Sequence, residues 1–150
     1  MLWFTHLAIA FFVLMLIRFN LTIDNIFIAV FLISNLLPDI DSEQSFIGKR
    51  TKPFSRIIQW LAKHRGFIHS LNFCLRISLI LVFIFPKAVI PFFFGYSLHL
   101  FADGFTKAGV RIFYPLKFKL KGFLRVGSFT EKLIFVLFLI IDMIFLLMQI

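Results

Sequence analysis

The chain is poor in cysteine and in acidic residues. Cys74 is its single cysteine, and seven of its 150 residues are Asp or Glu, against 16 Lys and Arg. One cysteine cannot form a disulfide within the chain, and it excludes a cysteine-rich zinc site. Charged residues of both signs make up 15% of the chain, whereas they make up about 25% of a soluble globular domain. The composition therefore excludes a disulfide-stabilised secreted domain and is unlike that of a soluble enzyme.

Apolar side chains take the place of the missing charge. Hydrophobic residues make up 61% of the chain, phenylalanine alone occurs 24 times, and the mean hydropathy is +0.98. A single domain of this size cannot hide so much apolar surface from water, so hydrocarbon is its expected solvent. We therefore predict one integral membrane domain over residues 1–150. The first residues lack the basic region and the cleavage site of a signal peptide, which predicts a retained first helix.

Five apolar stretches predict an all-α membrane protein. They are shorter than the roughly 20 residues that a helix needs to cross a bilayer. We therefore expect about five short transmembrane helices or tight helical hairpins. The stretches are Leu2–Ile17, Ile26–Leu37, Leu71–Phe85, Val89–Ala102 and Leu133–Ile150.

Positive charge is concentrated in the two long loops between these stretches. Residues 38–70 carry six Lys and Arg, residues 104–132 carry seven, and the opposite side has only Arg18 and Lys87. Cytoplasmic loops of inner-membrane proteins carry such an excess, and anionic headgroups attract it. The distribution of the basic residues behind the formal charge of +9 therefore predicts a multi-pass protein with both loops cytoplasmic. Membrane lipids are the expected partners, and nucleic acid is not.

Both loops also carry patterns of secondary structure. Apolar residues between Phe54 and Leu61 recur at helical spacing, which predicts an amphipathic helix lying in the membrane interface. Lysines alternate with apolar residues over 117–121, which predicts a short β-hairpin with a turn at Lys121–Gly122.

The predicted topology brings all four histidines and several acids to one level of the membrane. The first and third helices begin at the cytoplasmic face, and the second and fourth end there. The fifth begins there beside Glu131. Scattered packing residues would have no reason to converge in this way, and ionisable groups near apolar helices mark functional sites. The converging residues are His6, Asp39, Asp41, His64, His69, His99, Asp103 and Glu131.

His99 and Asp103 are the strongest local element of this site. A separation of four residues places both side chains on one helix face, within reach of a single ion. Imidazole and carboxylate ligands together favour zinc, with manganese or iron as alternatives. The sequence therefore predicts a divalent metal centre. Its predicted ligands are His6, Asp39, Asp41, His69, His99 and Asp103.

Several of these residues have a second interpretation. Pro38 ends a helix and turns Asp39 and Asp41 out of the hydrocarbon, so both acids could simply be solvated at a helix end. Carboxylates are unfavourable at a helix C-terminus, however, which indicates a cation nearby. The alternative interpretation of His6 is a histidine that lies in the membrane interface and has no functional role. Glu131 fits a helix cap with Ser128 as well as it fits a metal ligand.

His64 and Arg65 are the predicted catalytic residues. The guanidinium of Arg65 matches the geometry of a phosphate oxygen pair. A histidine titrates near neutral pH, so His64 can protonate a leaving group. Asp142 lies too far along the last helix to join this centre.

Three ordered motifs resemble the inner-membrane metal-dependent hydrolase family, also described as LexA-binding, inner-membrane-associated hydrolases. They are residues 36–42 (LLPDIDS), 64–71 (HRGFIHSL) and 95–110 (GYSLHLFADGFTKAGV). The resemblance runs from His6 to about Glu131. It implies a bacterial inner-membrane location and metal-dependent hydrolysis. Ile68 stands where the family has threonine, which implies one fewer hydrogen bond beside His69.

The predicted function is a membrane-embedded metal-dependent hydrolase acting on a phosphoester or lipid-like substrate at the cytoplasmic face. In this hypothesis the metal lowers the pKa of a bound water, which attacks the ester. The alternative is a non-catalytic, metal-stabilised membrane protein with a regulatory or scaffolding role. A metal transporter would need a continuous polar path, and the predicted spans offer little beyond Asn35, Arg76 and Asp142.

Overall fold

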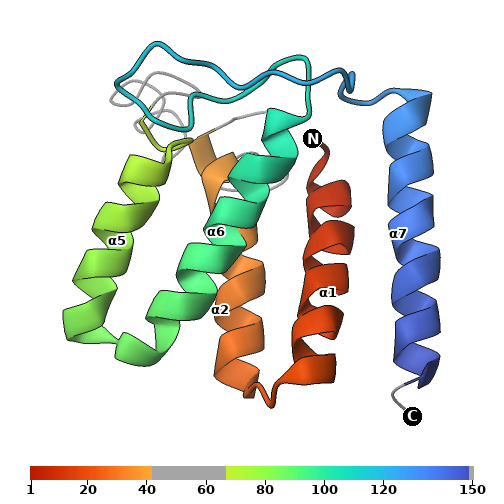
Figure 1. Cartoon of the computed structure of the whole chain (residues 1–150), viewed down its shortest axis with the longest axis horizontal. Coiled ribbons are helices and arrows are strands. Elements are labelled where there is room, and N and C mark those ends of the chain that lie inside the picture. Colours follow the sequence, from red (N-terminus) through yellow and green to blue (C-terminus); the bar gives the residue numbers. More distant parts are fainter. Residues whose placement is uncertain (42–66, 149–150) are drawn as a thin grey trace.

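Five α-helices lie side by side in the computed structural model, which describes residues 1–41 and 67–148, without the side chains of residues 40 and 41 (Figure 1). Each apolar stretch forms one helix, so the predicted all-α architecture is confirmed for this part of the chain. The predicted interfacial helix between Phe54 and Leu61 lies outside the described residues. The helices are α1 (Trp3–Asn20), α2 (Asn25–Leu36), α5 (Leu71–Ile84), α6 (Val89–Gly104) and α7 (Phe129–Met148), with short 3-10 helices η1 (Leu37–Asp41) and η2 (Pro86–Ala88).

Local signals set where the helices begin and end. The side chain of Asp24 accepts a hydrogen bond from the backbone N–H of Phe27 and caps the start of α2. Ser70 caps α5 in the same way through the N–H of Phe73. These caps satisfy backbone donors that a helix start leaves without a partner. α5 ends shortly before Pro86, which disfavours helical geometry in the residue before it.

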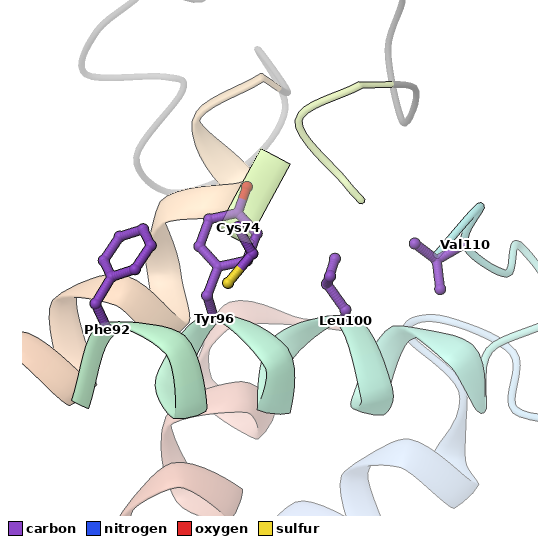
Figure 2. Close-up of a cluster of buried hydrophobic side chains, with 5 residues drawn as sticks. All are labelled: Cys74, Phe92, Tyr96, Leu100 and Val110. Carbon is purple, nitrogen blue, oxygen red and sulfur yellow. The ribbon is translucent and has the colours of Figure 1, made fainter. Parts of the chain in front are cut away.

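Helix α6 is the centre of the packing. Figure 2 shows Phe92, Tyr96 and Leu100 along one face of α6, with Cys74 of α5 and Val110 of the following loop packed against them. All five side chains are buried. This cluster fixes α5 against α6 beneath the end of the bundle that carries the predicted site residues.

On its other side α6 approaches α2 closely at Gly95. A Cβ atom at this position would lie 2.3 Å from the backbone oxygen of Phe31 and 2.3 Å from Oγ of Ser34. Only glycine permits this approach, because any larger residue would push the two helices apart. Asn35 reinforces the contact, since its Nδ2 donates a hydrogen bond to the backbone oxygen of Gly95 over 3.1 Å.

α1 is the single helix in the described ranges that is long and apolar enough, by length and composition, to cross a membrane. α2 with η1 and α5 are shorter apolar helices. Large apolar side chains are exposed on these helices and on the others, among them Phe83 of α5 and Leu147 of α7. An exposed surface of this kind is expensive in water, which agrees with the hydrocarbon solvent that the composition predicts.

The predicted hairpin at 117–121 is not formed. Residues 67–148 contain no strand, only isolated bridges that pair Val110 with Leu120 and Thr106 with Leu124. Leu120 exchanges two backbone hydrogen bonds with Val110, ten residues earlier, instead of pairing across a turn at Lys121–Gly122. Gly122 lies against the backbone of Phe105, where a Cβ would come within 2.2 Å of an oxygen. The loop after α6 thus folds back on itself across the end of the bundle (Figure 1).

Candidate metal centre

The site lies at the end of the bundle where α1, α5 and α7 begin and α2 and α6 end (Figure 1). The predicted convergence is therefore present in the structure for five of the six predicted ligands. His6 comes from the first turn of α1, Asp39 from η1, and His69 from the residues just before α5. His99 and Asp103 come from the last two turns of α6.

These side chains are almost completely removed from solvent. The relative exposure is 1% for His6, 2% for His69, 0% for His99 and 2% for Asp103, and Asp39 is half-buried. Ionisable groups are rarely buried unless they are paired or coordinate a metal. Five such groups in one buried cluster therefore require a common explanation.

Asp103 is the central carboxylate. Its Oδ1 lies 3.4 Å from Nε2 of His6, and its Oδ2 lies 3.8 Å from Nε2 of His69 and 3.8 Å from Nε2 of His99. The amino group of Met1 also contacts Oδ1. The two oxygens of one carboxylate thus face different partners, all of them nitrogen groups.

His99 presents a free lone pair to the site. Its Nδ1 and the backbone oxygen of Asn35 share a hydrogen bond of 2.7 Å. Its Nε2 is buried without a hydrogen-bond partner in the described part of the chain and lies 3.9 Å from Oδ1 of Asp39. A buried nitrogen without a partner is costly, and a metal ion would remove that cost.

His6 is still less satisfied. Both of its ring nitrogens are buried without a hydrogen-bond partner within the described ranges, although Nε2 lies 3.4 Å from Oδ1 of Asp103. Its ring stacks on that of His99, with the centroids 3.9 Å apart and the planes 10° from parallel. An interfacial histidine without a role would instead turn a nitrogen toward water.

Two overlapping triads have ligand atoms close enough to hold an ion. His6, His99 and Asp103 form one, Asp39, His69 and His99 form the other, and in each the ligand atoms lie within 4.8 Å of one another. Imidazole nitrogens and carboxylate oxygens are zinc ligands. Burial raises the pKa of the Asp39 carboxyl above its usual range, while His6 opposes this shift. A bound cation would favour the carboxylate form, so the residues present fit a divalent metal.

Two residues that position the site were not recognised from the sequence. Tyr96 donates a hydrogen bond of 2.6 Å to the backbone oxygen of Ile68 and so holds the turn that carries His69. Asn35 holds His99, as described above. An asparagine inside an apolar helix, four residues before a predicted ligand, was the available signal for the second of them.

The structure resolves the two interpretations of Glu131. Its Oε1 accepts the backbone N–H of Leu2 over 2.6 Å, and its Oε2 accepts that of Gly127 over 2.5 Å. Oγ of Ser128 accepts the N–H of Glu131 over 3.4 Å, which is half of the predicted capping box. Glu131 is thus an anchor between the starts of α1 and α7, and it belongs to neither triad.

Three predicted site residues are not placed. His64 and Arg65 lie outside the described residues. Asp41 ends η1, and the position of its side chain is likewise outside the description. The described centre therefore consists of His6, Asp39, His69, His99 and Asp103.

Comparison with known proteins identifies the family of the chain. The model of the YdjM inner membrane protein family matches residues 1–149. The chain belongs to this family. The chain is 39% identical over 93 residues to inner membrane protein YdjM of Escherichia coli (strain K12), and equally to that of Shigella flexneri. It is 32% identical over 103 residues to the uncharacterized protein YvsG of Bacillus subtilis (strain 168).

These alignments cover only part of the relatives. They include 57% of this chain and 47% of each YdjM protein, and 66% of this chain and 64% of YvsG. No solved structure matches the chain. Family membership supports an inner-membrane location, and it names no reaction.

Proposed function

We propose that this chain is a membrane-embedded, metal-dependent hydrolase of a phosphoester or lipid-like substrate at the cytoplasmic face of the bacterial inner membrane. The observation that carries the proposal is the buried cluster around Asp103, in which His6 and His99 have nitrogens without hydrogen-bond partners among the described residues. Zinc is the proposed ion, with manganese or iron as alternatives. A divalent ion bound there would supply Lewis acidity and would lower the pKa of a bound water to about 7.

The chain's own residues prepare this chemistry. Asp39, His69, His99 and Asp103 project ligand atoms toward one another from three different segments, and the α2–α6 contact at Gly95 and Asn35 fixes two of these segments. Holding ligands in place before binding is what distinguishes a metal centre from loose surface groups. Burial excludes bulk water and strengthens the electrostatic interactions within the site.

The surface next to the centre supports the proposed substrate class. The loop after α6 exposes Lys107, Arg111 and Arg125 at the same end of the bundle. Exposed Phe118 and Phe123 accompany them, and such mixtures of basic and aromatic residues favour the anionic headgroup layer. We therefore place the substrate bond at headgroup level and both basic loops in the cytoplasm, as expected for a multi-pass protein.

In the proposed reaction, water adds through its oxygen to phosphorus and loses one proton to the solvent, while the bond to the leaving alkoxide breaks. Arg65 holds a non-bridging phosphate oxygen, and His64 donates the proton that the alkoxide takes up and is protonated again from the solvent. The products are an alcohol and a phosphate with one ester bond fewer.

The test is turnover by the purified full chain in detergent. The substrates are bis(p-nitrophenyl) phosphate and a short-chain phospholipid, each with added zinc or manganese. Asp103→Asn should lower the rate at least about 100-fold, the lower part of the range for loss of a catalytic group. Asp142→Asn, an equal change in α7 away from the centre, should stay within about twofold, because α7 contributes no ligand to either triad.

A second pair of variants separates the enzyme from the non-catalytic alternative. His64→Ala and Arg65→Ala should retain the bound metal and lose turnover, because neither is a proposed ligand. If metal binds to the parent chain and no variant differs from it in the hydrolysis of either substrate, the metal stabilises the protein and does not serve catalysis.

A further inference from the structure

The stacking of His6 on His99 limits how these two residues can share a metal. Their ring planes are 10° from parallel and their centroids are 3.9 Å apart. An imidazole nitrogen binds a metal through a lone pair that lies in the plane of its ring. Two nearly parallel rings therefore direct their lone pairs side by side, and these do not converge on one ion.

Stacked rings are instead suited to two neighbouring ions. Paired ions in two-metal hydrolytic sites lie about 3.5–4 Å apart, and the spacing of the two rings falls within this range. Each ring has a nitrogen available, because Nε2 of His99 and both nitrogens of His6 are buried without hydrogen-bond partners in the described segments.

Asp103 lies where a bridging ligand would be needed. Its Oδ1 faces His6, and its Oδ2 faces His69 and His99. A carboxylate whose two oxygens face different partners can bind one ion through each oxygen. The amino group of Met1 also contacts Oδ1.

We propose that the centre holds two divalent ions bridged by Asp103. One is bound by His6 and Oδ1 of Asp103, and the other by Asp39, His69, His99 and Oδ2 of Asp103. This inference rests on the metal centre of the proposed function and specifies it further. It assigns a phosphoester as the substrate class, because two adjacent ions can contact the attacking and the leaving oxygen of one phosphoryl group.

The two positions differ in their number of protein ligands. In the described part of the chain, the His6 side offers two ligand atoms and the His99 side offers four. Fewer protein ligands leave more positions for water or substrate oxygens, so the ion beside His6 should exchange faster and bind more weakly.

The experiment is a measurement of metal stoichiometry. The full chain in detergent is dialysed against zinc at a fixed free concentration, and bound metal per chain is found by elemental analysis. The parent should hold two ions. His6→Ala should hold one, Asp103→Asn should hold fewer than the parent, and Asp142→Asn should hold two. A graded chelator should remove the two ions of the parent in separate steps.

A second readout needs no variant and so does not depend on whether His6→Ala folds. The parent loaded with manganese should give the electron paramagnetic resonance spectrum of two exchange-coupled ions, and partial removal by chelator should leave that of an isolated ion.

The outcomes separate this inference from the proposed function. One ion in the parent, with an isolated-ion spectrum, would overturn the two-ion centre and leave a single-metal hydrolase intact. Two ions in both the parent and His6→Ala would show that His6 holds neither. No metal in the parent at any zinc concentration would overturn both proposals.

Discussion

The backbone oxygen of Asn35 and Nδ1 of His99 are joined by a hydrogen bond of 2.7 Å, and this bond determines which nitrogen His99 offers to the site. A carbonyl oxygen has no proton to donate, so Nδ1 must carry the hydrogen. Nε2 then holds the lone pair and faces Asp39 and Asp103. Histidines that bind metals are commonly oriented by such a bond from their second nitrogen. The contact between α2 and α6 is therefore part of the centre's construction.

Substitution of Gly95 tests this dependence. In Gly95→Ala the new methyl group would meet the Phe31 oxygen and Ser34 Oγ at 2.3 Å and would separate α2 from α6. We expect a loss of about 1–3 kcal/mol of unfolding free energy, as for overpacked interiors. Zinc affinity should fall as well, because Asn35 and His99 move apart. Thermal unfolding and zinc titration in detergent measure the two effects.

The control for Gly95→Ala is Ile90→Ala on the same helix, where the side chain is 60% exposed. It should change neither the zinc affinity nor the unfolding midpoint by a comparable amount. Zinc affinity equal to that of the parent in Gly95→Ala would show that the centre does not depend on the close helix contact.

Tyr96→Phe tests the support of His69. The variant keeps the ring within the cluster of Figure 2 and removes the hydroxyl that donates to the Ile68 oxygen over 2.6 Å. Loss of such a supporting bond commonly lowers metal affinity about 10–100-fold, and we expect a decrease in that range. Tyr114→Phe removes the same group from a half-buried tyrosine in the loop and should leave the affinity unchanged. Equal affinities in all three proteins would exclude a positioning role for Tyr96.

Glu131 should affect stability without affecting metal stoichiometry. Glu131→Ala leaves the backbone N–H groups of Leu2 and Gly127 without their acceptor. Each bond to a charged group contributes about 1.5–3 kcal/mol, so the unfolding midpoint should fall clearly. Glu131→Gln retains one acceptor oxygen, so its unfolding midpoint should fall less. Loss of a full equivalent of metal in both variants would instead identify Glu131 as a metal ligand.

Much of the site follows from the order of the helices along the chain. The five apolar stretches determine which helix ends share a level, and this alone brings His6, Asp39, His69 and His99 together. The apolar pattern of each segment, taken in chain order, is sufficient for that step. The caps formed by Asp24 and Ser70 are likewise local, since each side chain binds an N–H three residues later.

Features that depend on distant partners could not be predicted in this way. The alternation over 117–121 is equally compatible with a hairpin and with the observed pairing of Leu120 to Val110, and the approach of Gly122 to Phe105 favours the second. Glu131 binds Leu2 across 129 positions of sequence. The stacking of His6 on His99 depends on the register of α1 against α6, which hydrophobic pattern does not specify.

Removal of metal should destabilise the chain through the centre alone. A ligand that binds only the folded state, at 100 times its dissociation constant, adds about 2.7 kcal/mol of stability. Chelation should therefore lower the thermal midpoint of the parent, and returning zinc should restore it. Asp103→Asn should respond less than the parent to both treatments, because its central ligand is lost. Asp142→Asn should respond as the parent does, since α7 contributes no ligand to either triad. An equal loss of stability in Asp103→Asn on chelation would place the stabilising ion elsewhere in the protein.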